Sequence, residues 1–368
     1  MTTTVIHEQN GKESALAPEL LVEMHAHMVM ARVLEERLIR MQKQGDGYFW
    51  IGGPGEEALN VPLGMLVDKG EGPSHDYLHL HYRSSGTMIA MGADPVDALR
   101  QMKSVASDPY SGGKNFCNHY AIKKWNVVPV SSPIEVQFSM APGTAIANKR
   151  AGGRAITIVQ GGDAGTAEAD FPTCLVWCSR PENPLPLLMI VANNQWGIST
   201  PAAGQHGEKR ISDRGKAFGI ECATIDANDP ESAYAGLKKA IDYVRRERRP
   251  FLLEAMVSRL YGHSSSSGAN FVTEEVDCIK RFEQKLEERG VLTKKYMEDL
   301  HTRLTHELLE ATKRVREEPQ PMGDTIYDDV FVKVDGKRDP AAMLPAASRA
   351  RTRDDGRDGS DGRDGSES

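Results

Sequence analysis

The sequence predicts an α/β fold: a mostly parallel sheet flanked by helices, with further helical segments at its N- and C-terminal ends. Two observations support this prediction. Short apolar runs alternate with helical patterns in the middle of the chain, and continuous apolar strands are typical of parallel sheets buried on both faces. The runs lie at 155–159, 187–192, 222–225 and 251–256, and the helical patterns between them lie at 168–178, 213–218 and 231–246.

The segments on either side of these runs are mainly helical. Apolar residues recur at three- and four-residue spacing from 18 to 44, which predicts one long helix ended by Gly45 and Gly47. Two shorter helices are expected at 60–67 and 95–105. The polar stretch 70–85 and the stretch 110–130 are expected to be loops. After the last strand, the pattern is helical again from 273 to 316, with a break at Gly290.

Composition narrows the class of protein. The chain has 368 residues and a formal net charge of −7, which argues against a nucleic-acid partner because phosphate backbones are bound by basic surfaces. No stretch approaches the roughly 18–20 consecutive apolar residues of a membrane span, and residues 1–13 contain no apolar signal core. A cytoplasmic protein that does not enter membranes is therefore expected. The five cysteines are scattered, which argues against a disulfide framework, and Cys174 and Cys178 are interpreted as buried thiols.

The expected domain organisation is simple. Residues 1–17 are expected to be a flexible N-terminus, and 18–345 a single cofactor-binding domain. Residues 346–368 are expected to be a disordered tail, because 349–368 consists almost exclusively of Arg, Asp, Gly and Ser and cannot bury enough apolar surface to order itself.

Two of the predicted strands end in unusual polar groups. Gly162-Asp163-Ala164-Gly165-Thr166 follows the first strand, where small residues let backbone N–H groups approach a phosphate. Asn193-Asn194-Gln195-Trp196 follows the second strand and offers amide and carbonyl oxygens. Ligands of open parallel sheets bind at the carboxyl ends of the strands, and Mg²⁺ prefers oxygen ligands. One β–α–β crossover would bring Asp163 and Asn194 to the same edge of the sheet.

Each motif alone is a weak signal, because turn residues at strand ends are common. No Gly-x-Gly-x-x-Gly follows a strand, so the motif is not a dinucleotide fingerprint. A second candidate is the group His75, His79 and His81, in which three imidazoles suggest zinc. A fourth ligand is missing nearby, which favours a solvated loop or a cofactor contact over a zinc site.

Gly162-Asp163 followed by Asn193-Asn194 resembles the thiamine diphosphate signature Gly-Asp-Gly…Asn-Asn. The longer stretches around both motifs resemble the α subunits of 2-oxo acid dehydrogenases. The resemblance covers roughly 18–332, and further matching segments occur in the family's order: Gly55-Glu56-Glu57-Ala58, Tyr82-Arg83, His119-Tyr120, Ser131-Ser132-Pro133 and Gly262-His263-Ser264. The resemblance implies a thiamine diphosphate-binding fold with Mg²⁺ as the metal.

The resemblance also implies roles for individual residues. Asp163 and Asn194 would bind Mg²⁺ through their side chains, and Trp196 through its backbone carbonyl. The remaining cofactor contacts would come from Tyr82 and Arg83 at the diphosphate, the backbone of Gly162, Ala164 and Gly165, and Ser132 and Ile134 near the aminopyrimidine. His263 would be the catalytic histidine of a loop that reaches the diphosphate and the reacting centre, and Ser264 matches a position that is phosphorylated in some relatives.

The chain departs from the family's pattern at several positions. Ala164 stands where the signature has its second Gly, and Ala192 stands where branched-chain relatives have an Arg. Val136 replaces a Thr that helps hold a potassium ion near Ser131-Ser132-Pro133 in some relatives, which argues against that ion here. The residues at 265–268 lack the acidic side chains usual after the histidine.

The function expected from the resemblance is that of a 2-oxo acid dehydrogenase α subunit. It would decarboxylate a branched-chain 2-oxo acid, 3-methyl-2-oxobutanoate, and pass the acyl group to the lipoyl domain of an acyltransferase component. The expected assembly has two α and two β subunits. Pyruvate or acetoin dehydrogenase is the alternative within the class, and a non-catalytic scaffold that binds cofactor without turnover is an alternative outside it. A self-sufficient transketolase-like enzyme would need a much longer chain.

Overall fold

The computed structural model describes residues 16–328. The chain divides into two compact units, Met1–Pro321 and Met322–Ser368. The first contains the sheet and the long helices, whereas the described part of the second is one short 3₁₀ turn, Gly323–Tyr327. Most of the predicted N-terminal flexible segment, the end of the predicted domain at 329–345 and the predicted tail at 346–368 lie outside the described residues. Within 16–328 there is no helix with the length and apolar character needed to cross a bilayer.

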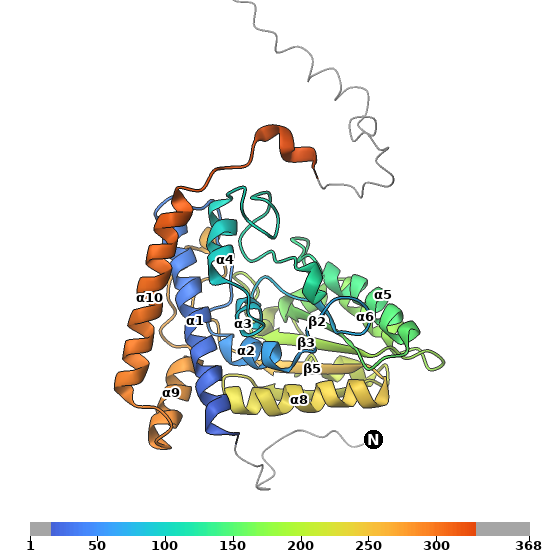
Figure 1. Ribbon diagram of the computed structural model, residues 1–368. Helices are drawn as coiled ribbons and strands as arrows, with labels where there is room; N and C mark the ends of the chain where they lie inside the picture. The colour runs from blue at the N-terminus through green and yellow to red at the C-terminus, as the bar shows by residue number, and fades with distance from the viewer. Residues whose placement is uncertain (1–15, 329–368) are drawn as a thin grey trace, which may run out of the picture. The chain divides into compact units, whose positions relative to one another are not determined.

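The sheet has five parallel strands in the order β1-β2-β3-β5-β4. Figure 1 labels its three central strands, β2, β3 and β5, which lie side by side. Their bounds are Tyr77–His79 for β1, Thr157–Gly162 for β2, Leu187–Asn193 for β3, Glu221–Asp226 for β4 and Phe251–Met256 for β5. The side chains of β2 and β3 are buried throughout, as expected for strands covered on both faces. This confirms the α/β class and the parallel sheet.

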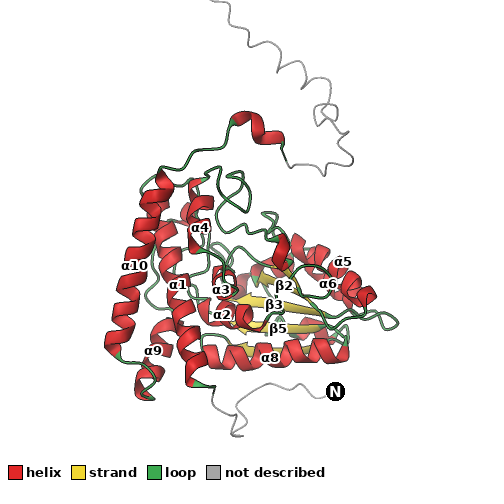
Figure 2. Cartoon of the chain, in the orientation of Figure 1, coloured by secondary structure: helices red, strands yellow, loops and turns green. Residues whose placement is uncertain are grey.

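Helices cover both faces of the sheet (Figure 2). On one face, α5 (Val136–Ala151) and α6 (Asp170–Cys178) pack on Val159 and Met189. On the other face, α8 (Pro230–Glu247) and α2 (Glu57–Leu66) pack on Ile158 and Ile190. Side chains alternate between the two faces of a strand, so residues 158 and 159 enter different cores.

The helical extensions form a third core beside the sheet. The long helix α1 (Pro18–Lys43) contacts α4 (Pro95–Lys103), α9 (Cys278–Glu288) and α10 (Lys294–Arg316), and α10 lies alongside α1 in Figure 1. The two remaining helices are α3 (Ser85–Ala90) and α7 (Asp213–Lys216). Asp94, Asp229, Asp277 and Thr293 cap the starts of α4, α8, α9 and α10 by accepting backbone N–H bonds. The expected helical extensions are therefore confirmed.

Three elements differ from the sequence-based expectation. Helix α3 was not predicted. The stretch 70–85 was expected to be a loop but contains strand β1, which pairs with β2 from Tyr77 opposite Thr157. Helix α5 was not predicted, because Pro142 and Gly143 interrupt its apolar pattern. Pro142 is tolerated because its neighbours are held against the sheet: Phe138, Ala141 and Ala145 are all buried.

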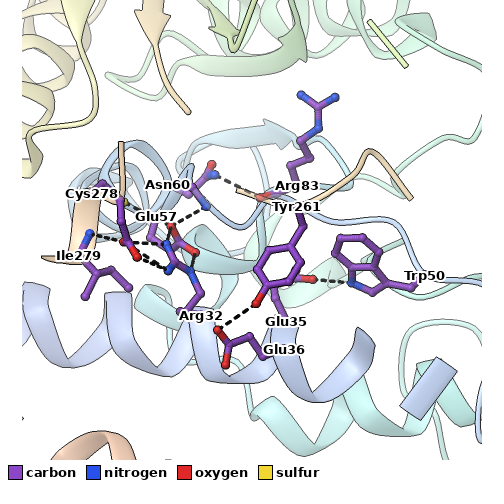
Figure 3. A network of polar contacts seen from close by, with 12 residues as sticks. Arg32, Glu35, Glu36, Trp50, Glu57, Asn60, Arg83, Tyr261, Cys278 and Ile279 are labelled. Atoms are coloured by element: carbon purple, nitrogen blue, oxygen red, sulfur yellow. Dashed lines mark hydrogen bonds and ion pairs between the residues drawn. The ribbon is translucent and has the colours of Figure 1, made fainter. Parts of the chain in front are cut away.

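A buried ion-pair network ties α1 to α2 and α9 (Figure 3). Arg32 on α1 donates two hydrogen bonds to the Glu57 carboxylate, at 2.7 and 2.9 Å, and three to the Asp277 carboxylate, at 3.1 to 3.3 Å. Glu57 also accepts the backbone N–H of Gly55 at 2.9 Å. The network therefore fixes the chain next to Glu56, which faces the candidate site.

Candidate active site

The ends of β2 and β3 bring the two sequence motifs together. The strands pair in parallel with Gly162 opposite Ala192, and the Asp163 N–H donates to the Ala192 carbonyl at 3.3 Å. Asp163 and Asn194 follow these paired positions directly and therefore lie at the same edge of the sheet. The juxtaposition expected from a single crossover is confirmed.

Three buried polar atoms of Asp163 and Asn194 lack hydrogen-bond partners. Both carboxylate oxygens of Asp163 are buried without a hydrogen bond, as is Nδ2 of Asn194. Burial raises the pKa of Asp163 above its usual value, while the nearby Arg83 acts to lower it. Oδ1 of Asn194 accepts the Trp196 N–H at 3.0 Å and has a second lone pair available. Buried polar groups are normally satisfied, so an unpartnered carboxylate next to an amide oxygen fits a divalent cation as its missing partner.

The loop that carries Asp163 is held by its own 3₁₀ turn and by a side chain of α7. It continues as a 3₁₀ turn, Ala164–Ala167, in which the Thr166 hydroxyl donates to the Asp163 carbonyl at 2.6 Å. Arg214 on α7 donates to the Thr166 carbonyl at 2.7 Å. Ala164 has an ordinary backbone conformation, since it is not among the residues with positive φ, so this turn accommodates a methyl group where the signature has glycine.

Arg83 places a cation beside this loop. Its guanidinium donates to the Glu56 carboxylate at 3.1 Å, and both side chains are buried. A Cβ on Gly162 would lie 3.4 Å from Nη1 of Arg83, an ordinary van der Waals contact, which shows that the guanidinium lies directly beside the loop. Burial acts to lower the pKa of Arg83, but Tyr82, Glu56 and Asp163 raise it by more, and the side chain stays charged. Burial raises the pKa of Glu56 to about 7, against the effect of Arg83.

Aromatic side chains surround the guanidinium. The His81 and Tyr82 rings have centroids 3.8 Å apart, and the His263 ring meets the Tyr82 ring edge-on at 6.1 Å. Burial, Arg83 and Arg259 together lower the pKa of His263 to about 3, so its imidazole is neutral at ordinary pH. Nδ1 of His263 is buried without a partner. His263 can therefore offer a neutral donor or acceptor, but not a positive charge.

Ser132 and Ile134 lie in the segment that leads into α5. The Ser132 hydroxyl contacts Nε2 of His119 at 2.9 Å, and Nδ1 of His119 lies 2.9 Å from the Cys117 carbonyl. Because a carbonyl only accepts, Nδ1 carries the proton and Nε2 accepts from Ser132. Ile134 is exposed, which leaves its side chain free to contact another molecule.

The segment after β3 turns sharply at Gln195, whose φ is +64°. This turn lets the Trp196 N–H bond back to Asn194. The Trp196 ring is partly exposed, and the Arg259 guanidinium lies 5.7 Å from its centroid. Arg259 also donates to the Gly197 carbonyl at 2.7 Å, so the segment after Trp196 is held to the one that leads to His263.

The structure adds four charged residues to the site that were not assigned roles from the sequence. They are Glu56 beside Arg83, Arg214 on the Thr166 carbonyl, Arg259 on the Gly197 carbonyl, and Glu135, whose carboxyl accepts the Gly162 N–H at 3.2 Å. Burial raises the pKa of Glu135 to about 8, against the effects of the Gly162 N–H and Arg83. One signal pointed to it, since Glu135 is the only charged residue between 125 and 148.

The histidines His75, His79 and His81 do not form a metal site. His75 contacts Asp68, His79 contacts Thr144 and His81 stacks on Tyr82, so the three imidazoles diverge. Within 16–328, three or more His, Cys, Asp or Glu side chains nowhere converge in a way that could hold a metal. Cys174 and Cys178 are buried thiols, as predicted.

Ser264 lies on the loop that follows His263. Its side chain is buried and accepts the Ser266 N–H at 3.2 Å, while the Ser267 hydroxyl accepts the Ser264 N–H at 3.0 Å. This capping box starts the 3₁₀ turn Ser265–Ser267. Serine side chains therefore supply the local order of a loop that lacks acidic residues.

Comparison with known proteins identifies the family. The family model described as "Dehydrogenase E1 component" matches residues 25–323. The chain is 28% identical over 326 residues to the 2-oxoisovalerate dehydrogenase subunit alpha of Bacillus subtilis, covering 86% of this chain and 97% of that protein. It is 28% identical over 331 residues to the mitochondrial subunit alpha 2 of Arabidopsis thaliana, covering 88% of this chain and 68% of that protein. It is 25% identical over 330 residues to the mitochondrial subunit alpha of Homo sapiens, covering 87% and 72%.

The chain belongs to the family of dehydrogenase E1 components and is a 2-oxo acid dehydrogenase E1 α subunit. It is thus part of a thiamine diphosphate-dependent oxidoreductase, and the family implies thiamine diphosphate and a divalent cation. The unpartnered Asp163 carboxylate and the buried Arg83 at the end of the sheet fit this requirement, because they offer one ligand for a cation and one for a diphosphate.

Proposed function

We propose that this α subunit works with a β subunit to decarboxylate a branched-chain 2-oxo acid, with 3-methyl-2-oxobutanoate as the leading substrate. The acyl group would pass to the lipoyl domain of an acyltransferase component. The observation that supports a working cofactor site is the Asp163 carboxylate, buried and without a partner beside Arg83. Support for the branched-chain class comes from the relatives, which are named 2-oxoisovalerate dehydrogenase subunits.

The residues at the carboxyl end of the sheet would hold the cofactor and its metal. The side chains of Asp163 and Asn194 and the carbonyl of Trp196 would hold Mg²⁺. The proposed cofactor contacts are Tyr82, Arg83 and His263 at the diphosphate, the backbone of Gly162, Ala164 and Gly165 beside it, and Ser132 and Ile134 near the aminopyrimidine. When bound, thiamine diphosphate supplies a carbanion nucleophile and an electron sink for the departing carbon dioxide.

The side chains of this chain would bind and orient rather than carry out bond-breaking steps. Arg83 offers a planar, permanently charged donor that is already fixed by Glu56, so little reorganisation is needed to meet an anion. His263 is neutral, since its pKa is lowered to about 3, and can therefore donate or accept a hydrogen bond at the reacting centre. We propose His263 as the catalytic residue of this subunit.

The partner would cover an apolar surface on α5 and α6. Met140, Val176 and Trp177 are exposed on these two helices, which pack against each other. Exposed large apolar side chains on adjacent helices are typical of a surface that another subunit buries. We propose that a β subunit docks here and supplies the acid that activates the aminopyrimidine, in an assembly of two α and two β subunits.

Two alternatives differ in substrate or in activity. Pyruvate or acetoin could be the substrate, because the named relatives share only 25–28% of aligned residues with this chain. A scaffold that binds cofactor without turnover is the alternative of a different class. It is favoured by Ala192, which stands where branched-chain relatives have an Arg.

The decisive experiment is co-expression of this chain with its β subunit, followed by assay with thiamine diphosphate and Mg²⁺. Reduction of an artificial electron acceptor would be measured with branched 2-oxo acids, pyruvate and acetoin in parallel. We expect turnover that needs both subunits and is fastest with a branched substrate. If turnover is fastest with pyruvate or acetoin, that compound replaces 3-methyl-2-oxobutanoate as the proposed substrate. Cofactor binding without any turnover would favour the scaffold.

The matched variants are Asp163→Ala and Asp226→Ala. Asp226 also ends a strand of this sheet, but it pairs with Arg281 at the surface, away from the motifs. Loss of activity in Asp163→Ala with activity kept in Asp226→Ala is the expected result. Equal activity in the two variants would refute the metal-binding role of Asp163.

A further inference from the structure

Glu135 has an unusual position immediately before α5. Its φ is +63°, in the left-handed region that disfavours side chains other than glycine, asparagine and aspartate. Its side chain is almost fully buried, at 1% exposure, and makes no capping bond to α5. A buried carboxyl on a strained backbone is retained only where the surrounding structure uses it, so these two features call for a local reason.

The carboxyl group lies against the loop that carries Asp163. Its Oε1 accepts the Gly162 N–H at 3.2 Å. A Cβ on Gly161 would lie 2.3 Å from Oε2, and a Cβ on Gly165 would lie 2.1 Å from Oε1. The carboxyl therefore fills the space that side chains would need at both ends of the loop 161–165, a segment that includes the last two residues of β2.

The second carboxyl oxygen is unsatisfied. Oε2 of Glu135 is buried without a hydrogen-bond partner. Arg83 and Asp163 both act electrostatically on the Glu135 carboxyl, which bonds directly to the Gly162 N–H next to Asp163. A role limited to packing would be served by an apolar side chain without leaving a polar atom unpaired.

We propose that Glu135 is a positioning residue that sets the shape of the loop 161–165, and through it the direction of Asp163 and of the backbone N–H groups. The inference rests on the proposed function of this site, because it assigns the loop to cofactor binding. Glycine is required at positions 161 and 165, because a Cβ at either position would overlap the Glu135 carboxyl. Glu135 acts through the loop and is not a ligand itself.

The test uses three variants of the assembly co-expressed with the β subunit. Glu135→Gln keeps an acceptor oxygen of the same shape. Glu135→Gly removes the side chain but suits the positive φ, so the backbone can keep its course. The matched control is Asn148→Ala, which removes a buried polar side chain on the same helix that contacts the start of β2, at Thr157.

The first readout is the affinity for thiamine diphosphate in the presence of magnesium chloride, measured by calorimetry. We expect Glu135→Gly to weaken binding by about tenfold, and Glu135→Gln and Asn148→Ala to stay within about threefold of the wild type. Wild-type affinity in Glu135→Gly would overturn the inference. A loss in Glu135→Gln as large as in Glu135→Gly would also overturn it, because charge and not shape would then matter.

The second readout needs no cofactor. Amide hydrogen exchange of the segment 161–166 should be faster in Glu135→Gly than in the wild type, since the Gly162 N–H loses its acceptor. Unchanged exchange would overturn the positioning role even if the wild type binds cofactor. If exchange is faster in Glu135→Gly but the wild-type assembly does not bind thiamine diphosphate, the positioning role is supported and the proposed function is refuted.

Discussion

Replacing Arg32 with methionine should strongly destabilise the chain. Arg32 is buried and bonds to both oxygens of Glu57 and to Asp277, so the change leaves two carboxylates without their cation. Breaking a buried ion pair from one side costs about 3–5 kcal/mol. We therefore expect the free energy of unfolding to fall by about 4 kcal/mol and the unfolding temperature to fall by roughly 10 °C.

The assay is urea unfolding followed by circular dichroism, with Arg303→Met as the control. Arg303 forms a helical ion pair with Glu307 at the surface, where both side chains are at least half exposed, and such pairs contribute about 0.3–0.5 kcal/mol. The double variant Arg32→Met with Glu57→Leu should recover part of the lost stability, because it removes one of the stranded charges. The reasoning is refuted if Arg32→Met is no less stable than Arg303→Met.

Three further predictions concern the site. Arg83→Lys should weaken thiamine diphosphate binding by about tenfold in calorimetry, because lysine cannot reproduce the planar donors that meet Glu56 and an anion, and unchanged affinity would contradict the role of the guanidinium. The pKa of His263 is lowered to about 3 in the folded state, against about 6.5 in the unfolded state. As the pH falls from about 6.5 towards 3, the unfolded state therefore binds a proton that the folded state does not, and this histidine destabilises the folded state increasingly. His263→Gln should therefore gain stability relative to the wild type on going from pH 7.5 to pH 5 in urea unfolding, and a pH-independent difference would show that the imidazole is not kept neutral. Ser264→Ala should speed amide exchange across 264–267 through loss of a cap that contributes about 1 kcal/mol, and unaltered exchange would show that the capping box does not order this turn.

The sequence predicted the buried strands well, because their signal is local. Residues 187–192 and 251–256 are apolar throughout, and the structure forms β3 at Leu187–Asn193 and β5 at Phe251–Met256. Strand β1 was missed because only three residues pair, and they lie among histidines and charged residues that are typical of loops. Its pairing depends on β2, some eighty positions further along, which no local pattern can indicate.

The site was predictable where its residues follow strands. Asp163 and Asn194 could be placed together because parallel strands end at one edge. Glu135 could not be placed in the same way. Its contact with the Gly162 N–H depends on its own left-handed backbone conformation, which no sequence pattern indicates. Glu56 lay in a motif that matched the family, but only the structure shows that it faces Arg83.

The strand order has a consequence for the synthesis of the chain. Strand β5 lies between β3 and β4, although β4 precedes it in the sequence. Among the strands of 16–328, β4 pairs with β5 alone, so it leaves the ribosome with no partner in place. Until Phe251–Met256 emerges, β3 and β4 both present open edges, and open edges invite pairing with other chains. A translational pause after β4 has emerged and before β5 has emerged would therefore lengthen the interval in which the nascent subunit is most prone to aggregate.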